Sequence, residues 1–412
     1  MNTGLTPEDY FLIDWCRVAP TSLAADSAAR YDGMDWPRLL RRAESNRVGP
    51  LLFRNLKEAP NAPAVPANIL ADFRSSYLRG IDVATRVTAE LGPVAERFRD
   101  EGIPLVLLRG LSAGTALYGD TALRPFTDVD LLILRQDLPR ARQCMETAGC
   151  VAVDGALGPS YFEKYHLHAA YRHTASGALF ELHWALDHRY VPFTIFYPSI
   201  VASAREIDIG GVQIRMPCPE HDLLASAIHA AKHAYFLPFL DHDESLLRRV
   251  VDEGCLLHFC DIARAAAGHG GELNWDRIIE ESRAWNVMRE LSVVLRTTDR
   301  LFPGSLPEEV MGRLERPAPS WIERAAFRSL DHDATRNVKT GPKRPSRVAA
   351  LRIRPMFRPV RVLDLLRYVN PGPQFLRYRY RCRSRHATLL FRFAHPLVAA
   401  AELAGNAIAC LR

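Results

Sequence analysis

The sequence predicts an α+β fold in which a small mixed sheet lies between two helical lobes. Residues 103–108 and 128–134 form apolar runs with the length of buried strands, and residues 165–172 and 178–184 alternate apolar and polar side chains. On either side, residues 67–101 and 219–301 repeat apolar side chains every three to four positions, as amphipathic helices do. Strands in the middle and helices at both ends therefore define the expected architecture.

The N-terminal part of the chain is predicted to be helical. Thr6 and Pro7, followed by two acidic residues, give a cap and a first turn that suit the positive end of a helix dipole. Helical periodicity returns at residues 36–56, and the Pro-rich residues 60–66 form a loop before the long helix. The length of 412 residues favours two or three domains. We expect a helical lobe at 1–85, the core at 86–218, a second helical lobe at 219–330 and a basic tail at 331–412.

Turn signals divide the core into its elements. Arg109 and Gly110 interrupt the first apolar run, and residues 112–118 follow as a short helix. A helix at 138–148 ends at Gly149, because glycine readily takes the left-handed conformation of a helix end. Turns at residues 176–177 and 210–211 predict two hairpins, joining 165–172 to 178–184 and dividing 207–216.

The second helical lobe is predicted from helices at 219–234, 246–267 and 274–301. The first of them carries His229 and His233 one turn apart, with Lys232 beside them. Such a histidine pair can bind zinc, but no nearby Cys or Glu in the sequence completes a ligand set. Contact with a substrate phosphate and packing between helices are the competing interpretations.

Acidic side chains on two predicted strands carry the strongest chemical signal. Asp128 and Asp130 are two residues apart, so in a strand both carboxylates project to the same side. Glu181 and His183 share one face of residues 178–184, and Glu181 on an adjacent strand would complete a cluster of three carboxylates. Neighbouring carboxylates resist joint ionisation unless a positive charge lies between them, and Mg²⁺ or Mn²⁺ supplies that charge. This arrangement suits phosphoryl or nucleotidyl transfer.

The order of these motifs resembles the nucleotidyltransferases of the DNA polymerase beta superfamily. More narrowly, the chain is similar to the bacterial family of uncharacterised nucleotidyltransferases, over roughly residues 5–301 and with its sharp motifs at 109–184. That family also has histidine and aspartate on helices where this chain has His229, His233 and Asp261. The motifs that carry the resemblance are Arg109-Gly110, Arg124, Asp128-Val129-Asp130 and Glu181-Leu182-His183-Trp184.

The resemblance implies a nucleotidyltransferase core that moves a nucleoside monophosphate from an NTP to a hydroxyl or phosphate of an acceptor. The acceptor would be a small molecule, a sugar or a peptide. In that scheme Asp128, Asp130 and Glu181 are the catalytic and metal-binding residues. Residues that would bind the nucleotide are Arg109, Gly110, Ser112, Arg124 and His183. Two features depart from the pattern: Arg109 stands where lysine is usual, and Leu111 follows Gly110 where the wider superfamily has serine, leaving Ser112 as its substitute.

Composition favours a globular cytoplasmic protein. Hydrophobic residues make up 48% and charged residues 24%, which is ordinary for a globular chain. The eight cysteines show no zinc-type spacing and suit a reducing compartment. The first ten residues do not resemble a signal peptide, and we find no apolar run of about 18 residues.

The tail has the opposite charge to the rest. Residues 336–385 carry 15 Lys or Arg against Asp364 alone, a net charge of +14, whereas residues 1–335 carry −9. RNA, anionic lipid headgroups and the acidic body of the same chain are all compatible with the basic cluster at 377–385. The amphipathic residues 389–411 favour an anionic membrane surface over RNA, and a helix packed on the chain's own lobe explains them as well. We predict no specific nucleic acid.

Two other functions stay open at this point. One is a catalytically silent nucleotidyltransferase fold that serves as a binding or antitoxin-like module. The intact carboxylates at Asp128, Asp130 and Glu181 argue against it. The other is a peripheral membrane or RNA-binding protein that works through the basic tail.

Overall fold

The computed structural model of the chain divides into two compact units. The first comprises residues 1–153, 170–186 and 195–317. The second comprises residues 154–169, 187–194 and 318–412 and lies mostly outside the described residues. The predicted domain boundaries at 85, 218 and 330 stay predictions. The structure describes residues 4–18, 30–153, 163, 166–187, 193–234, 236–240, 245–268, 273–316, 373, 376, 384, 386 and 388–396.

A seven-stranded mixed sheet with the strand order β3-β4-β5-β2-β1-β7-β6 forms the core. Strand β1 pairs antiparallel with β2 and parallel with β7, while β2 pairs parallel with β5. The expected mixed α+β fold is therefore confirmed, and the two strands predicted to carry acidic residues are neighbours. The strands are β1 (Val106–Leu108), β2 (Val129–Leu132), β3 (Cys150–Ala152), β4 (His168–His173), β5 (Leu179–His183), β6 (Arg205–Ile209) and β7 (Val212–Met216).

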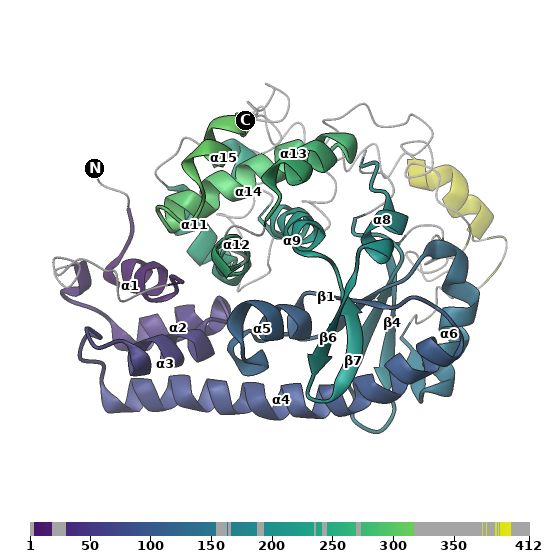
Figure 1. Cartoon of the computed structure of the whole chain (residues 1–412), viewed down its shortest axis with the longest axis horizontal. Coiled ribbons are helices and arrows are strands. Elements are labelled where there is room, and N and C mark those ends of the chain that lie inside the picture. Colours follow the sequence, from purple (N-terminus) through teal and green to yellow (C-terminus); the bar gives the residue numbers. More distant parts are fainter. Residues whose placement is uncertain are drawn as a thin grey trace. The chain divides into compact units, whose positions relative to one another are not determined.

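The helices come from the parts of the sequence before, between and after the strands. The long helix α4 (Ala67–Asp100) packs against α3 near its start and against β7 and α6 further along, so it joins the first helices to the sheet (Figure 1). The other helices are α1 (Pro7–Trp15), α2 (Trp36–Ser45), α3 (Gly49–Glu58), α5 (Gly110–Tyr118), α6 (Leu138–Thr147), α8 (Tyr197–Ala202), α9 (Pro219–His233), α10 (Leu237–Leu240), α11 (Leu246–Asp252), α12 (Leu256–Gly268), α13 (Trp275–Ala284), α14 (Met288–Leu301) and α15 (Glu308–Arg313), with short 3-10 turns η3 (Thr121–Leu123) and η4 (Arg135–Asp137).

Three stretches predicted as continuous helix are each broken into two. The breaks lie at Arg47, Gly254 and Asn286, which adopt φ values of +57°, +70° and +58°. A residue in this left-handed region cannot continue a right-handed helix. At Gly254 a Cβ atom would lie 2.7 Å from the Ser45 carbonyl oxygen, so the close approach of two helix corners requires glycine there. The apolar spacing continues across each break, and for that reason it gave no signal.

The first strand is also shorter than predicted. It begins at Val106 instead of residue 103. Pro104 has no backbone N–H to donate to a neighbouring strand, which is consistent with a later start. Thr6 stands at the N-cap of α1, as predicted, and its backbone N–H donates to the Asp9 carboxylate at 3.0 Å.

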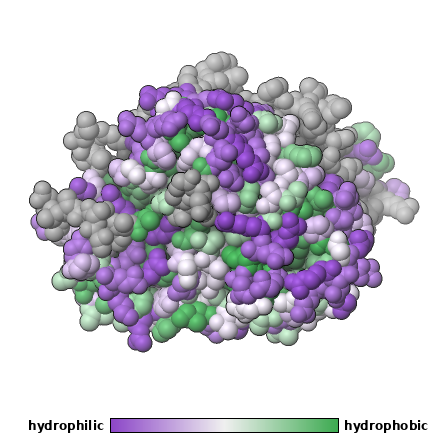
Figure 2. All heavy atoms as spheres, viewed as in Figure 1, coloured by the Kyte–Doolittle hydropathy of each residue, from purple (hydrophilic) through white to green (hydrophobic). Residues whose placement is uncertain are grey.

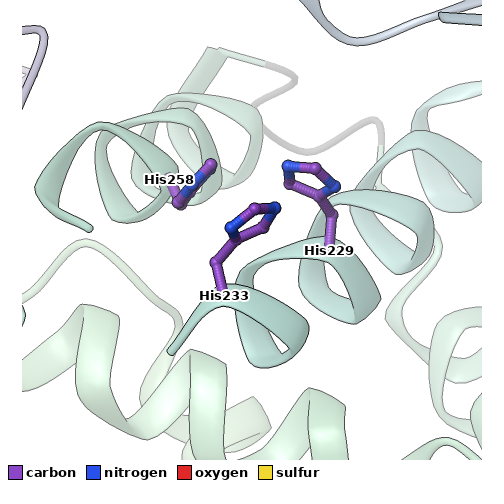
Figure 3. Close-up of side chains that lie close together, drawn as sticks. All are labelled: His229, His233 and His258. Carbon is purple, nitrogen blue, oxygen red and sulfur yellow. The ribbon is translucent and has the colours of Figure 1, made fainter. Parts of the chain in front are cut away.

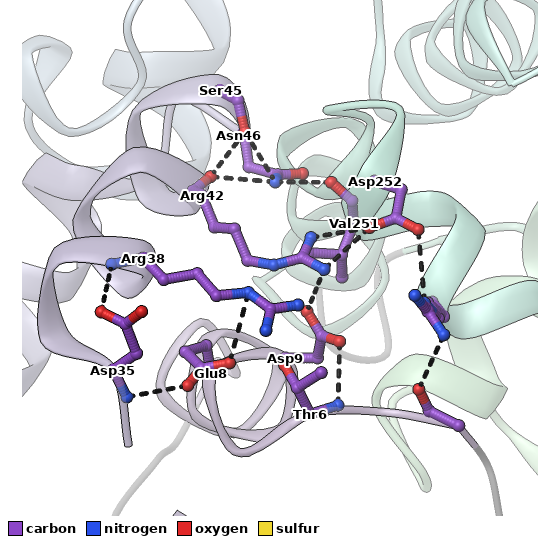
Figure 4. Close-up of polar contacts among 12 residues, drawn as sticks. Thr6, Glu8, Asp9, Asp35, Arg38, Arg42, Ser45, Asn46, Val251 and Asp252 are labelled. Atoms are coloured by element: carbon purple, nitrogen blue, oxygen red, sulfur yellow. Dashed lines mark hydrogen bonds and ion pairs between the residues drawn. The ribbon is translucent and has the colours of Figure 1, made fainter. Parts of the chain in front are cut away.

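Polar contacts join the corner between α2 and α3 to the corner between α11 and α12, although some 200 residues separate them (Figure 4). The Asn46 side-chain amide donates to the Val251 carbonyl at 2.9 Å, and its oxygen accepts from the Leu256 backbone N–H at 3.0 Å. Arg42 forms ion pairs with Asp9 and Asp252 at 3.1 and 2.8 Å. These contacts fix the backbone of Arg47 beside the start of α12.

Hydrophilic side chains cover much of the face shown in Figure 2, with smaller hydrophobic areas between them. Among the described residues, no helix has the length and apolar character needed to span a membrane. Most of the tail, including residues 377–383, lies outside the described residues. Within the predicted amphipathic stretch, residues 389–396 are helical and expose Leu389, Leu390 and Phe393. The membrane and RNA interpretations of the tail stay predictions.

Candidate active site

The chain leaves β1 through a strained turn. Arg109 adopts φ +49° and ψ −151°, a region that residues with a side chain rarely occupy, and Gly110 follows at φ +47°. The helix α5 begins directly at Gly110, two residues earlier than predicted. The fully buried Ser112 hydroxyl donates to the Arg109 carbonyl at 2.7 Å and so helps to hold the turn. Backbone strain of this kind clusters at functional sites because the surrounding structure must maintain it.

The three predicted carboxylates lie on adjacent strands. Asp130 in β2 lies opposite Glu181 in β5 in the parallel register, and Asp128 immediately precedes β2. Burial raises the pKa of the Asp128 carboxyl, and the charges of Asp130 and Glu181 raise it further. The sheet therefore brings together the acidic residues that the sequence placed on separate strands.

Two cationic side chains hold Asp130. Arg109 donates from Nε and Nη2 to one Asp130 oxygen at 3.1 and 2.6 Å, and His183 Nε2 donates to the other oxygen at 2.7 Å. Burial acts to raise the pKa of the Asp130 carboxyl, but Arg109 and His183 hold it far below its ordinary value. Asp130 is thus a carboxylate that is already ion-paired on both oxygens.

His183 lies between carboxylates. Its Nε2 also lies 3.3 Å from a Glu181 oxygen, and its Nδ1 lies 3.4 Å from the Ala185 carbonyl, so both ring nitrogens face acceptors. Burial lowers the pKa of His183, but Asp130 and Glu181 raise it above the ordinary histidine value. Three acidic side chains thus face Arg109 and His183 at this edge of the sheet.

Arg124, predicted to bind the nucleotide, forms a buried ion pair with Asp261. Its Nε and Nη2 donate to one Asp261 oxygen at 3.2 and 2.8 Å, and the Tyr118 hydroxyl donates to the other at 2.7 Å. Arg124 and Asp261 both have side chains less than 10% exposed. Burial opposes the charge of Arg124, but Asp261 raises its pKa above the usual arginine value. The Arg264 guanidinium lies over the Tyr118 ring, 4.7 Å from its centroid.

Three histidines meet where α9 packs against α12. His229 and His233 lie one turn apart on α9, and His258 comes from the first turn of α12. Their rings lie 4.4 to 5.1 Å apart, centroid to centroid. Arg47 Nη2 lies 3.4 Å from His258 Nε2. The sequence offers no nearby Cys or Glu to complete the histidine pair, and the structure instead places beside it a third histidine, 25 residues later along the chain.

The sequence did not single out His258, Tyr118 or Arg47. Each reaches its neighbours through tertiary contacts between segments more than 20 residues apart, and local spacing carries no trace of such contacts. Asp261 was noted in the sequence, but its partner Arg124 lies 137 residues away. The i, i+3 spacing of His258 and Asp261, which places both on one side of α12, was the one local signal available.

A family described as "Uncharacterised nucleotidyltransferase" matches residues 32–303, which confirms the resemblance drawn from the motifs. The chain belongs to this family. No curated protein matches it. Among solved structures, it is similar to the antibiotic-resistance factor ANT(2'')-Ia, whose solution structure is described as revealing substrate-regulated conformation dynamics. The match has 14% identity and a TM-score of 0.32 and covers 49% of this chain and 92% of that one. That similarity is too low to define a substrate.

Proposed function

We propose that the chain transfers a nucleoside monophosphate from an NTP to a hydroxyl or phosphate oxygen of an acceptor, with Mg²⁺ or Mn²⁺ bound by Asp128, Asp130 and Glu181. Family membership supports nucleotidyl transfer in general. The observation that carries the finer proposal is the register of Asp130 opposite Glu181, next to Asp128 and behind the strained Arg109-Gly110 turn.

The donor set fits a hard divalent cation, which prefers carboxylate oxygens. The positive charges of Arg109 and His183 compensate the negative charge of Asp130. The pKa of Asp128, in contrast, remains raised by burial and then by its acidic neighbours. When bound, the cation would neutralise charge on the phosphate oxygens.

The chain's own residues have separate roles in this scheme. Arg109 binds and orients the triphosphate, and the missing side chain of Gly110 lets a phosphate approach the backbone. Glu181 accepts the proton of the acceptor. At the same time the acceptor oxygen bonds to the α-phosphorus, and the bond from that phosphorus to pyrophosphate breaks. Arg124 positions the turn before β2 through its ion pair with Asp261. Ser112, which is fully buried, supports the Arg109 carbonyl.

Thermal unfolding with Mg²⁺ and each NTP tests this proposal. The NTP that binds should raise the melting temperature of the wild type only when Mg²⁺ is present, because a ligand that binds the folded state stabilises it by mass action. Asp130→Asn should abolish that rise while the protein stays folded. The control Asp82→Asn alters an exposed ion pair on α4 and should respond like the wild type. An unchanged response of the Asp130 variant would refute the assignment.

A further inference from the structure

The histidine cluster of α9 and α12 has the geometry of a metal site separate from the carboxylates. One nitrogen from each of His229, His233 and His258 can be chosen so that all three lie within 4.8 Å of one another. Figure 3 shows the three rings gathered together, two from one helix and one from the other, with His258 stacked on His233 and edge-on to His229. A closure of the rings by a small side-chain movement would bring these nitrogens to one ion.

Two of the three rings have the protonation that a metal requires. Burial lowers the pKa of His229 and His258 well below the ordinary value, and positive charge lowers both further: that of Arg109 for His229, and those of His233, when it is protonated, and Arg47 for His258. Rings that stay neutral near pH 7 each keep a nitrogen lone pair. His229 Nδ1 is buried and has no hydrogen-bond partner among the described residues, and a proton on Nδ1 would leave the lone pair on Nε2 for a metal.

We propose that His229, His233 and His258 bind one divalent transition-metal ion of the zinc class. Imidazole nitrogens suit zinc, cobalt and copper, whereas Mg²⁺ prefers oxygen, so this site would not compete for the ion held by Asp128, Asp130 and Glu181. Three histidine ligands leave one coordination position open, as in catalytic zinc sites. The ion would also join α9 to α12.

Positive charge around the cluster sets the affinity. Arg47, Arg109, Arg124 and Lys232 all lower the pKa of one or more of these rings, and the same charges oppose a bound dication. Arg47 is the direct competitor, because its Nη2 occupies the lone pair of His258 Nε2 at 3.4 Å. Removing Arg47 should therefore tighten metal binding, an effect that a loss of folding cannot imitate.

The test uses the full-length protein without a polyhistidine tag and stripped of metal by a chelator. Titration with Co²⁺, followed by its visible absorption, and with Zn²⁺, followed by calorimetry, should show one saturable site per chain. His229→Ala and His233→Ala should each remove it. The matched control His221→Asn changes another buried histidine of α9, which contacts Ser203 and Glu281 instead, and should keep the site. Arg47→Met should bind Zn²⁺ about tenfold more tightly.

Melting in the presence of chelator establishes that each variant is folded, and Asp128→Asn should retain Zn²⁺ binding. The absence of a saturable site in the wild type would overturn the proposal. Zn²⁺ binding by the His229 and His233 variants that is as tight as in the wild type would overturn it too. A third outcome would also overturn the proposal: the wild type binds no Zn²⁺, and the His233 variant loses the binding of Mg²⁺ and NTP. That result would assign the histidines to a phosphate.

Discussion

The carboxylate cluster on the sheet and the histidine cluster on the helices solve the same electrostatic problem in opposite ways. At the sheet, direct ion pairs keep Asp130 ionised, because both Arg109 and His183 donate hydrogen bonds to its carboxylate. At the helices, the groups lose their charge instead, because burial lowers the pKa of His229 and His258. An oxygen-rich anionic site thus lies in the same compact unit as a neutral nitrogen-rich one.

This contrast shows how histidine takes its role from its surroundings. His183 lies between two carboxylates and has a raised pKa, whereas His258 lies beside Arg47 and has a lowered one. The free energy that separates the two states is about 1.4 kcal/mol for each pKa unit. A histidine that remains charged can hold an anion, and one that remains neutral can hold a metal.

The largest effect is expected at the carboxylate cluster, for Glu181→Gln. If Glu181 accepts the acceptor's proton, its loss should lower turnover by about 10²–10⁴-fold and leave NTP binding nearly unchanged. Turnover is measured as pyrophosphate release with water as the acceptor, using the NTP that raises the melting temperature most. Asp82→Asn serves as the control, since Asp82 pairs with Arg86 at an exposed position. Near-normal turnover in the Glu181 variant would reduce the cluster to two working members.

A smaller effect is expected for Asp261→Ala, which acts on the element between the two clusters. Asp261 lies on α12, three residues after His258, and accepts hydrogen bonds from Arg124 and Tyr118. Its loss leaves a buried arginine without its partner, which costs about 3–5 kcal/mol. The free energy of unfolding, taken from urea titrations, measures this.

The matched variant for that experiment is Asp82→Ala. It removes an exposed i, i+4 pair and should cost no more than about 0.5 kcal/mol. Equal losses for the two variants would mean that the Arg124–Asp261 pair adds nothing beyond a surface contact.

The sequence predicted the carboxylate cluster well because its signal is local. Alternation places Asp130 and Glu181 on known faces of two strands, and pairing of those strands does the rest. The sequence could not predict that Arg109 and His183 would donate hydrogen bonds to Asp130, since the position of Arg109 depends on its left-handed backbone. Local spacing favours such a conformation for glycine and gives no sign of it for arginine.

The histidine cluster was half visible in the same way. His229 and His233 follow from helical spacing, but His258 joins them only because the chain breaks at Gly254 and starts α12 beside α9. The contacts of Asn46 with Val251 and Leu256 hold that corner, and they join segments about 200 residues apart. Helical periodicity reports the faces of helices and not their partners.

The smallest effect concerns Asp222, which lies on α9 and reports the field around both clusters. Burial, followed by the charge of Asp261, raises the pKa of Asp222 to about 6, against an ordinary value of 3.8, although Arg109, Arg124 and Arg205 act to lower it. The folded state therefore binds more protons than the unfolded state between about pH 4 and pH 6. The contribution of Asp222 to stability is fully present below that window and is lost as the pH rises through it, by up to about 3 kcal/mol.

Asp222→Asn removes the titrating group. Urea unfolding of both proteins at several pH values between 4 and 8 should show the wild type losing stability relative to the variant as the pH rises, with a level difference above pH 7. A difference that does not change with pH would show that Asp222 titrates as an ordinary carboxyl.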